Sequence, residues 1–299
     1  MSMKKTGRTI SCFSASICRV LNEKGINILE EQLFCSEKLL ALECKTPYDS
    51  AFIDLESVVM DALTKLRICI QPIKIVNLQA LQEELVLEGA VLMKTKIDFL
   101  RYSTLFSTAI TMQRGHYVVL KREGNKIRLI DSYIPTTPLT QYDDWYEITE
   151  EMVEKSLFFR VFRDEGSTPC EDLRDLVREI QQRFLEDEQK KRAFEHFKQN
   201  VCQLKPSEKH ICYEMSSALS ITGTVASRRV FKRMVESTNS FSEETISSLD
   251  EICKQYNLVR MLLLKCYLRF DDRNIEDTVY AISKLHKNEE RVLRKLNTM

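Results

Sequence analysis

The pattern of hydrophobic residues changes near residue 166, and this change constrains the fold more than any other feature of the sequence. Before it, short apolar or β-branched segments of strand length alternate with segments of helical period. The segments with strand character are 69–76, 90–93, 116–121, 127–131, 145–148 and 158–162. The helices predicted among them are 12–25, 28–42, 52–66, 78–87 and 150–157.

Beyond residue 166 every periodic segment has helical spacing, and none has the character of a strand. The helices predicted there are 173–204, 208–220, 227–235, 243–270 and 275–296. Glycine and proline are scarce, at 7 and 6 residues, which favours helix over a turn-rich all-β fold. We therefore expect an α+β protein with a mixed domain at 1–165 and an all-α helical domain at 166–299.

Charge and hydropathy argue against several classes of function. The chain carries 44 basic and 44 acidic residues, so no overall charge favours nucleic acid or an anionic membrane as a partner. No apolar run approaches the length of a membrane span, and the basic N-terminus is not followed by the apolar segment of a secretion signal. We expect a cytoplasmic protein without a membrane segment.

The ten cysteines are scattered and include no Cys-x-x-Cys pair, so most are expected to be reduced and buried. Cys202, His210 and Cys212 are the only residues that resemble a set of metal ligands. Their spacing is poor and no fourth ligand follows, so no metal site is expected.

One cysteine stands where a helix is predicted to begin. Ser11 is a suitable N-cap, apolar residues from Phe13 to Leu21 recur at helical spacing, and Gly25 ends the segment. Free backbone N–H groups and partial positive charge at a helix N-terminus favour the thiolate form of Cys12 and could stabilise an oxyanion. A small apolar residue at the start of a core helix fits the same pattern, so this stretch alone does not decide between the two interpretations.

A predicted hairpin supplies a base and a carboxylate. The strand that begins at His116 turns at 123–126 and returns in a strand that ends at Asp131. Residues near the open ends of such a hairpin are expected to lie opposite each other, which pairs an imidazole with a carboxylate. Such a pair orients the ring, and together with Cys12 it makes a nucleophile, a base and an orienting group. If Asp131 is not the orienting group, Asp98, Asp143 and Asp144 are the alternatives.

The chain resembles papain-like folds and, more narrowly, the butirosin biosynthesis protein H family of acyltransferases, including the amide synthetase of closthioamide biosynthesis. The residues that carry the resemblance are Cys12 at a helix start, Gly89-Ala90-Val91-Leu92-Met93 with Asp98 and Tyr102 after it, Gly115-His116-Tyr117-Val118-Val119-Leu120, and Ile130-Asp131. It covers about the first 165 residues, and it matches Cys12 to the nucleophile, His116 to the base and Asp131 to the orienting carboxylate. One departure is that 4–11 contains no glutamine, the residue that supplies the oxyanion hole in papain-type peptidases.

The resemblance implies a papain-like catalytic domain that takes an acyl group from the phosphopantetheine arm of an acyl or peptidyl carrier protein and passes it to a small amine, possibly a diamine, in natural-product biosynthesis. No bound cofactor is expected, because aminolysis of a thioester runs downhill and no Gly-x-x-x-x-Gly-Lys loop is present. Carrier proteins are acidic, so Lys4, Lys5 and Arg8 are candidate docking residues, although they could equally be solvated terminal charges. The helical domain or the segment 98–113 is expected to cover the site.

Two other classes remain open at this point. A cysteine peptidase or thioesterase would use the same three residues with water as the acceptor. A helical interaction protein without catalysis would not need Cys12 at all.

Overall fold

The structure is a computed structural model and describes residues 10–41, 55–100, 102, 115–132, 142–164, 173–219 and 223–296. Within these residues it contains a six-stranded antiparallel sheet and ten α-helices, with the C-terminal part helical, which confirms the α+β class. The chain forms two compact units, 1–33 with 63–168 and 34–62 with 169–299. They differ from the predicted domains mainly in residues 34–62, which group with the helical part.

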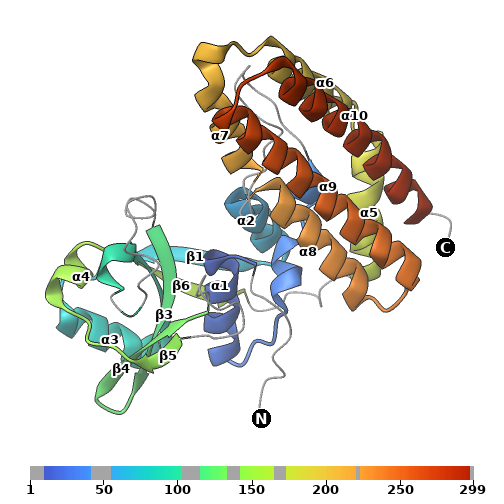
Figure 1. The fold of residues 1–299 in the computed structure, drawn as a ribbon. Helices are drawn as coiled ribbons and strands as arrows, with labels where there is room; N and C mark the ends of the chain where they lie inside the picture. The colour runs from blue at the N-terminus through green and yellow to red at the C-terminus, as the bar shows by residue number, and fades with distance from the viewer. Residues whose placement is uncertain are drawn as a thin grey trace. The chain divides into compact units, whose positions relative to one another are not determined.

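The sheet belongs to the first unit, and all its strands run antiparallel in the order β1-β6-β2-β3-β4-β5 (Figure 1). The strands are β1 (Ile68–Ile73), β2 (Ala90–Lys96), β3 (Gly115–Glu123), β4 (Lys126–Asp131), β5 (Tyr142–Trp145) and β6 (Leu157–Arg163). The predicted hairpin is confirmed as β3 and β4, and Gly124 takes a φ of 61° in the turn between them. The strand predicted at 145–148 is wrong by three residues, because the chain leaves the sheet after Trp145 and buries Ile148 beside α4 (Glu150–Glu154).

Helices cover both faces of this sheet (Figure 1). Helix α1 (Cys12–Glu23) packs on one face, where the ring of Phe13 lies 4.6 Å from that of Tyr117. Helix α3 (Leu78–Glu88) packs on the other, where Leu81 and Leu85 join Val118 in the core. The alternation of side chains along β3 explains the division, because neighbouring residues point to opposite faces.

Helices α1 and α3 begin and end as predicted. The side chains of Ser11 and Asn77 accept hydrogen bonds from the backbone N–H three residues later, at Ser14 and Ala80. Gly25, just beyond the C-cap of α1, has a positive φ of 80°, a conformation that favours glycine.

The helix predicted at 28–42 is wrong. The chain there forms two 3₁₀ turns, Glu30–Phe34 and Glu37–Leu40, with Ser36 between them. The Ser36 hydroxyl accepts a hydrogen bond from the N–H of Lys38 and donates one to Asp61, so it caps the second turn instead of extending the first. A polar side chain that competes for backbone groups thus outweighs the helical period of the apolar residues.

The second unit is a bundle of helices around a core that contains buried polar groups. Its helices in the C-terminal part are α5 (Leu173–Glu186), α6 (Glu188–Gln203), α7 (Lys209–Ala218), α8 (Thr224–Ser237), α9 (Glu243–Leu268) and α10 (Asp272–Lys295). The predicted helix 173–204 is divided at Asp187, whose carboxylate caps α6 through the N–H of Gln189. Helix α2 (Leu55–Lys65) falls mainly in this unit. Across the parts of the chain that are described, no helix is both long enough and apolar enough to cross a membrane.

Candidate active site

The hairpin of β3 and β4 brings His116 and Asp131 together. Their Nε2 and Oδ2 atoms lie 2.9 Å apart, within hydrogen-bond distance. The ladder ends with Val119 opposite Ile130, and continuing its register by one step would set Val118 opposite Asp131. His116 is therefore the diagonal neighbour of Asp131 on the same face of the sheet, not its direct partner as the sequence predicts.

Asp131 is enclosed and accepts two hydrogen bonds at one oxygen. Its exposed fraction is 0%, and His116 is only 3% exposed. Oδ2 accepts the Nε2–H of His116 and also the hydroxyl of Tyr102, at 2.6 Å. The ring of Tyr102 rests edge-on against Tyr146 at 5.5 Å. Because Asp131 bonds Nε2, it fixes the orientation of the imidazole ring.

The start of α1 places Cys12 beside this imidazole. It is the first residue of the helix, behind the N-cap Ser11, and it forms a side-chain hydrogen bond with His116. Cys12 is partly exposed, whereas His116 and Asp131 are buried. As a first-turn residue it has a backbone N–H without an intrahelical acceptor, which can receive an oxyanion. The three residues predicted from the sequence therefore form one connected set.

The surroundings of His116 favour its charged form. Burial alone lowers the pKa of this imidazole, but hydrogen bonds to Asp131 and Cys12, and the charges of both, outweigh burial and raise the pKa to about 10. At neutral pH the ring is therefore an imidazolium, the form that pairs with a thiolate and can protonate a leaving group.

A fourth residue, the acid Glu30, lies beside Cys12, and no sequence pattern indicated it. Both carboxylate oxygens of Glu30 accept the N–H of Ile10, at 3.0 and 3.1 Å, and one also accepts the N–H of Ser11 at 3.2 Å. The hydroxyl of Ser14 donates to the same carboxylate at 2.6 Å. Glu30 therefore binds the backbone immediately before Cys12. A contact across 20 residues leaves no local sequence signal, and Tyr102 was indicated only through the family resemblance.

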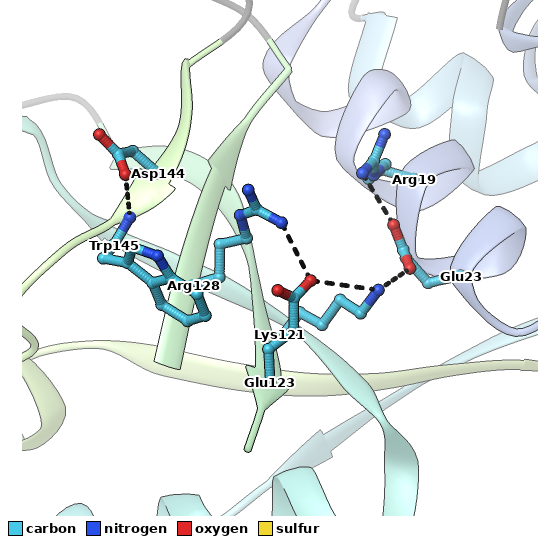
Figure 2. A network of polar contacts seen from close by, with 7 residues as sticks. All are labelled: Arg19, Glu23, Lys121, Glu123, Arg128, Asp144 and Trp145. Atoms are coloured by element: carbon cyan, nitrogen blue, oxygen red, sulfur yellow. Dashed lines mark hydrogen bonds and ion pairs between the residues drawn. The ribbon is translucent and has the colours of Figure 1, made fainter. Parts of the chain in front are cut away.

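Polar contacts hold the far end of α1 against the sheet, as Figure 2 shows. Glu23 bridges Arg19 at 2.8 Å and Lys121 at 2.6 Å, and Lys121 in turn lies 3.7 Å from Glu123. Arg128 continues the network from β4, with 3.0 Å to Glu123. Partly exposed pairs of this kind add little stability individually, but together they restrict how α1 can move along β3.

Other predicted residues take no part in this set. Asp98 and Asp144 are exposed, and Asp144 accepts the N–H of Trp145, which leaves Asp131 as the described carboxylate bonded to His116. The side chain of Asp143, the docking candidates Lys4, Lys5 and Arg8, and most of the covering segment 98–113 lie outside the described residues.

No group of three potential metal ligands occurs among the residues that the structure describes. Of the cysteines considered as ligands in the sequence, Cys202 is exposed on α6 and Cys212 is buried on α7. Neither a comparison with models of protein families nor one with curated proteins finds a match to this sequence.

Proposed function

We propose that this protein is a cysteine-dependent acyltransferase that moves an acyl group from a carrier-protein thioester, through an acyl-enzyme on Cys12, to an amine. The observation that carries the proposal is the connected set of Cys12, His116 and Asp131, with the thiol at a helix start and the carboxylate on Nε2 of the imidazole. The choice of a carrier thioester and an amine, and of a papain-like fold, rests on the family resemblance stated above.

The first step forms the acyl-enzyme. The Cys12 thiolate attacks the thioester carbonyl, and the N–H groups at the start of α1 stabilise the oxyanion. The carbon–sulfur bond to the phosphopantetheine arm then breaks, and the imidazolium of His116 protonates the departing thiolate. A thioester is exchanged for a thioester, so no ATP is consumed.

The second step forms the amide. A neutral amine attacks the acyl group on Cys12, His116 accepts the proton from the attacking nitrogen, and the Cys12 thiolate leaves. The original thiolate and imidazolium are thereby restored. If water attacked instead, the same residues would catalyse hydrolysis, so the acceptor alone separates this proposal from a thioesterase or peptidase.

The surroundings proposed for this reaction are a reducing compartment and an acidic partner. No disulfide joins the described cysteines, which supports the cytoplasm. Lys4, Lys5 and Arg8 immediately precede the nucleophile in sequence and are proposed to meet the acidic surface of the carrier protein.

Intact-protein mass spectrometry tests the proposal. The protein is incubated with acylated carrier protein, with and without a primary amine or diamine. We expect an acyl adduct that maps to Cys12, persists without amine, and is discharged as an amide when amine is added. Loss of the acyl group at the same rate with and without amine, or cleavage of peptides in a parallel assay, would identify a hydrolase.

Two cysteines of the same helix provide the matched variants. Cys12→Ala is expected to abolish adduct and turnover without changing the unfolding temperature. Cys18→Ala should keep both activities, because Cys18 lies six residues on, about 240° around the helix, and is buried in the core. A fully active Cys12→Ala protein would rule out the proposed enzyme and favour a binding function.

A further inference from the structure

Glu30 completes the cap of the helix that carries Cys12. In a capping box the N-cap side chain accepts the N–H of the third helical residue, whose own side chain binds the N–H of the N-cap. Ser11 and Ser14 make the first of these bonds, at 3.1 Å. The second is made by Glu30, a residue from another segment, which accepts the N–H of Ser11 and the hydroxyl of Ser14.

The position of this carboxylate is unfavourable for an ionised group. Burial raises the pKa of Glu30 to about 7, although the hydrogen bonds from Ser14, Ile10 and Ser11 act to lower it. The neighbouring Glu31 raises it further, and the buried Cys18 thiol on α1 lies within the influence of the same two acids. Because the folded pKa exceeds the ordinary value of 4.5, ionising Glu30 weakens folding as the pH rises from about 4.5 to 7.

A buried acid that is retained against stability, beside a nucleophile, is typical of a functional site. The hydrogen bonds explain what its charge achieves here. An ionised Glu30 has acceptors for both backbone N–H groups and for the Ser14 hydroxyl, whereas a protonated Glu30 must present an O–H donor among these donors. Protonation therefore weakens the attachment of the two residues that lead into Cys12.

We infer that Glu30 is a positioning residue whose ionised carboxylate holds the backbone at Ile10 and Ser11, and through it keeps the Cys12 thiol in reach of His116. The inference rests on the proposed role of Cys12 as nucleophile. It also assigns the donors at this helix start: Glu30 uses the N–H groups of Ile10 and Ser11, which leaves that of Cys12 for the oxyanion.

Alkylation of Cys12 tests this inference without carrier protein or amine. The rate of modification by iodoacetamide is measured from pH 5 to 9 by mass spectrometry of the Cys12 peptide. We expect the rate in the unaltered protein to rise through a step with a midpoint near 7, because ionised Glu30 is the holding form. In Glu30→Gln this step should be absent and the rate at pH 8 lower by roughly 10- to 100-fold, the usual penalty for a displaced reactive group.

Two matched variants should shift the pH midpoint of Cys12 alkylation in opposite directions. Glu31→Gln removes a charge that raises the pKa of Glu30, so the midpoint should fall while the rate at pH 8 is kept. Ser14→Ala removes a hydrogen bond that lowers that pKa, so the midpoint should rise. This pair keeps the test decisive even if Glu30→Gln does not fold.

An unchanged step in Glu30→Gln, or a rate at pH 8 equal to or above that of the unaltered protein, would overturn the inference. So would midpoints that do not move in Glu31→Gln and Ser14→Ala. Because alkylation needs no acyl substrate, these results are independent of the mass-spectrometric test for acyl transfer. The acyl-transfer test can therefore fail while the alkylation results support the role of Glu30. The alkylation test can also fail while acyl transfer is observed.

Discussion

Each of the two units buries a carboxylate between a tyrosine hydroxyl and a basic side chain, yet only one of these arrangements is suited to chemistry. In the sheet unit Asp131 accepts from His116 at 2.9 Å and from Tyr102 at 2.6 Å. In the helical unit Glu289, which is 2% exposed, accepts the Nε–H of Arg228 at 2.7 Å and the hydroxyl of Tyr256 at 2.7 Å.

The first set consists of Asp131 with its donors, and the second set consists of Glu289 with its donors. They differ in whether the basic side chain can exchange a proton. The ring of His116 also interacts with Cys12, and an imidazole can release and regain a proton. Arg228 also donates from Nη1 to the hydroxyl of Ser227 and from Nη2 to the carbonyl of Leu40, and a guanidinium stays protonated. A buried carboxylate with two donors therefore orients an imidazole in one unit and joins segments distant in sequence in the other.

The largest expected effect comes from removing the orienting charge in the first set. Asp131→Asn should lower turnover by about 10⁴-fold, because an amide favours the wrong tautomer of His116. The charge of Asp131 also helps to raise the pKa of His116, so Asp131→Asn should lower stability at neutral pH as well, and turnover is compared per folded molecule. The matched variant Glu289→Gln should lower stability only, with turnover per folded molecule unchanged. If Asp131→Asn kept its activity, the assignment of Asp131 as orienting group would be lost.

Breaking the second set should give the next largest effect, and on stability alone. Arg228→Leu leaves Glu289 charged, buried and without its ionic partner, which should lower the free energy of unfolding by about 3–5 kcal/mol. Urea denaturation measures this change. The triple variant Arg228→Met, Glu289→Leu, Tyr256→Phe removes the whole set and should recover most of the loss. A stable Arg228→Leu protein would show that the ion pair does not hold these segments together.

The features that depend on neighbouring residues could be predicted from the sequence. The start of α1 at Ser11 and the hairpin turn at Gly124 follow from local chemistry, because capping and turn geometry depend on a few neighbouring residues. The approach of His116 to Asp131 followed from that hairpin, although their diagonal placement needed the register.

What could not be predicted depends on contacts between distant segments. Glu30 reaches the backbone before Cys12 across 20 residues, and Arg228 meets Glu289 across 61. Apolar periodicity carries no information about such polar contacts, and it also led to a single helix at 28–42, where Ser36 caps a separate turn. The grouping of residues 34–62 with the helical unit was missed for the same reason.

The pH dependence of stability should also separate the two sets. The folded pKa of His116, about 10, exceeds its ordinary value of 6.5, so its contribution is complete below pH 6.5 and is lost as the pH rises through 10. The slope from one such group is at most about 1.4 kcal/mol per pH unit. Arg228 stays charged over this range, since the charge of Glu289 raises its pKa despite burial, and contributes no slope.

Unfolding free energies measured between pH 6.5 and 10 check this difference. The unaltered protein and Arg228→Leu should lose stability in parallel as the pH rises, because both retain His116. His116→Gln should have a shallower slope. A slope that is identical with and without His116 would contradict the raised pKa.

The smallest expected effects come from removing the two tyrosine hydroxyls, which are the most similar groups in the two sets. Each donates one hydrogen bond to a buried carboxylate, and a hydrogen bond to a charged group contributes about 1.5–3 kcal/mol. In Tyr102→Phe this loss should appear mainly in the rate, as a reduction of about tenfold or more, because Asp131 is held less firmly against His116. In Tyr256→Phe it should appear as lower stability, measured by urea denaturation, with the rate per folded molecule unchanged.

Both variants remove one oxygen atom and leave the ring in place, so packing is nearly the same in each. The Tyr146 ring beside Tyr102 supplies a control, since its hydroxyl donates to the carbonyl of Phe99 and not to Asp131. Tyr146→Phe should therefore leave the rate within about twofold, because the shared oxygen of Asp131 keeps both of its donors. If Tyr102→Phe and Tyr256→Phe lowered stability equally and neither changed the rate, the hydrogen bond from the Tyr102 hydroxyl would contribute only to stability, as the one from Tyr256 does. The functional distinction between the two sets would then rest on His116 and Cys12 alone.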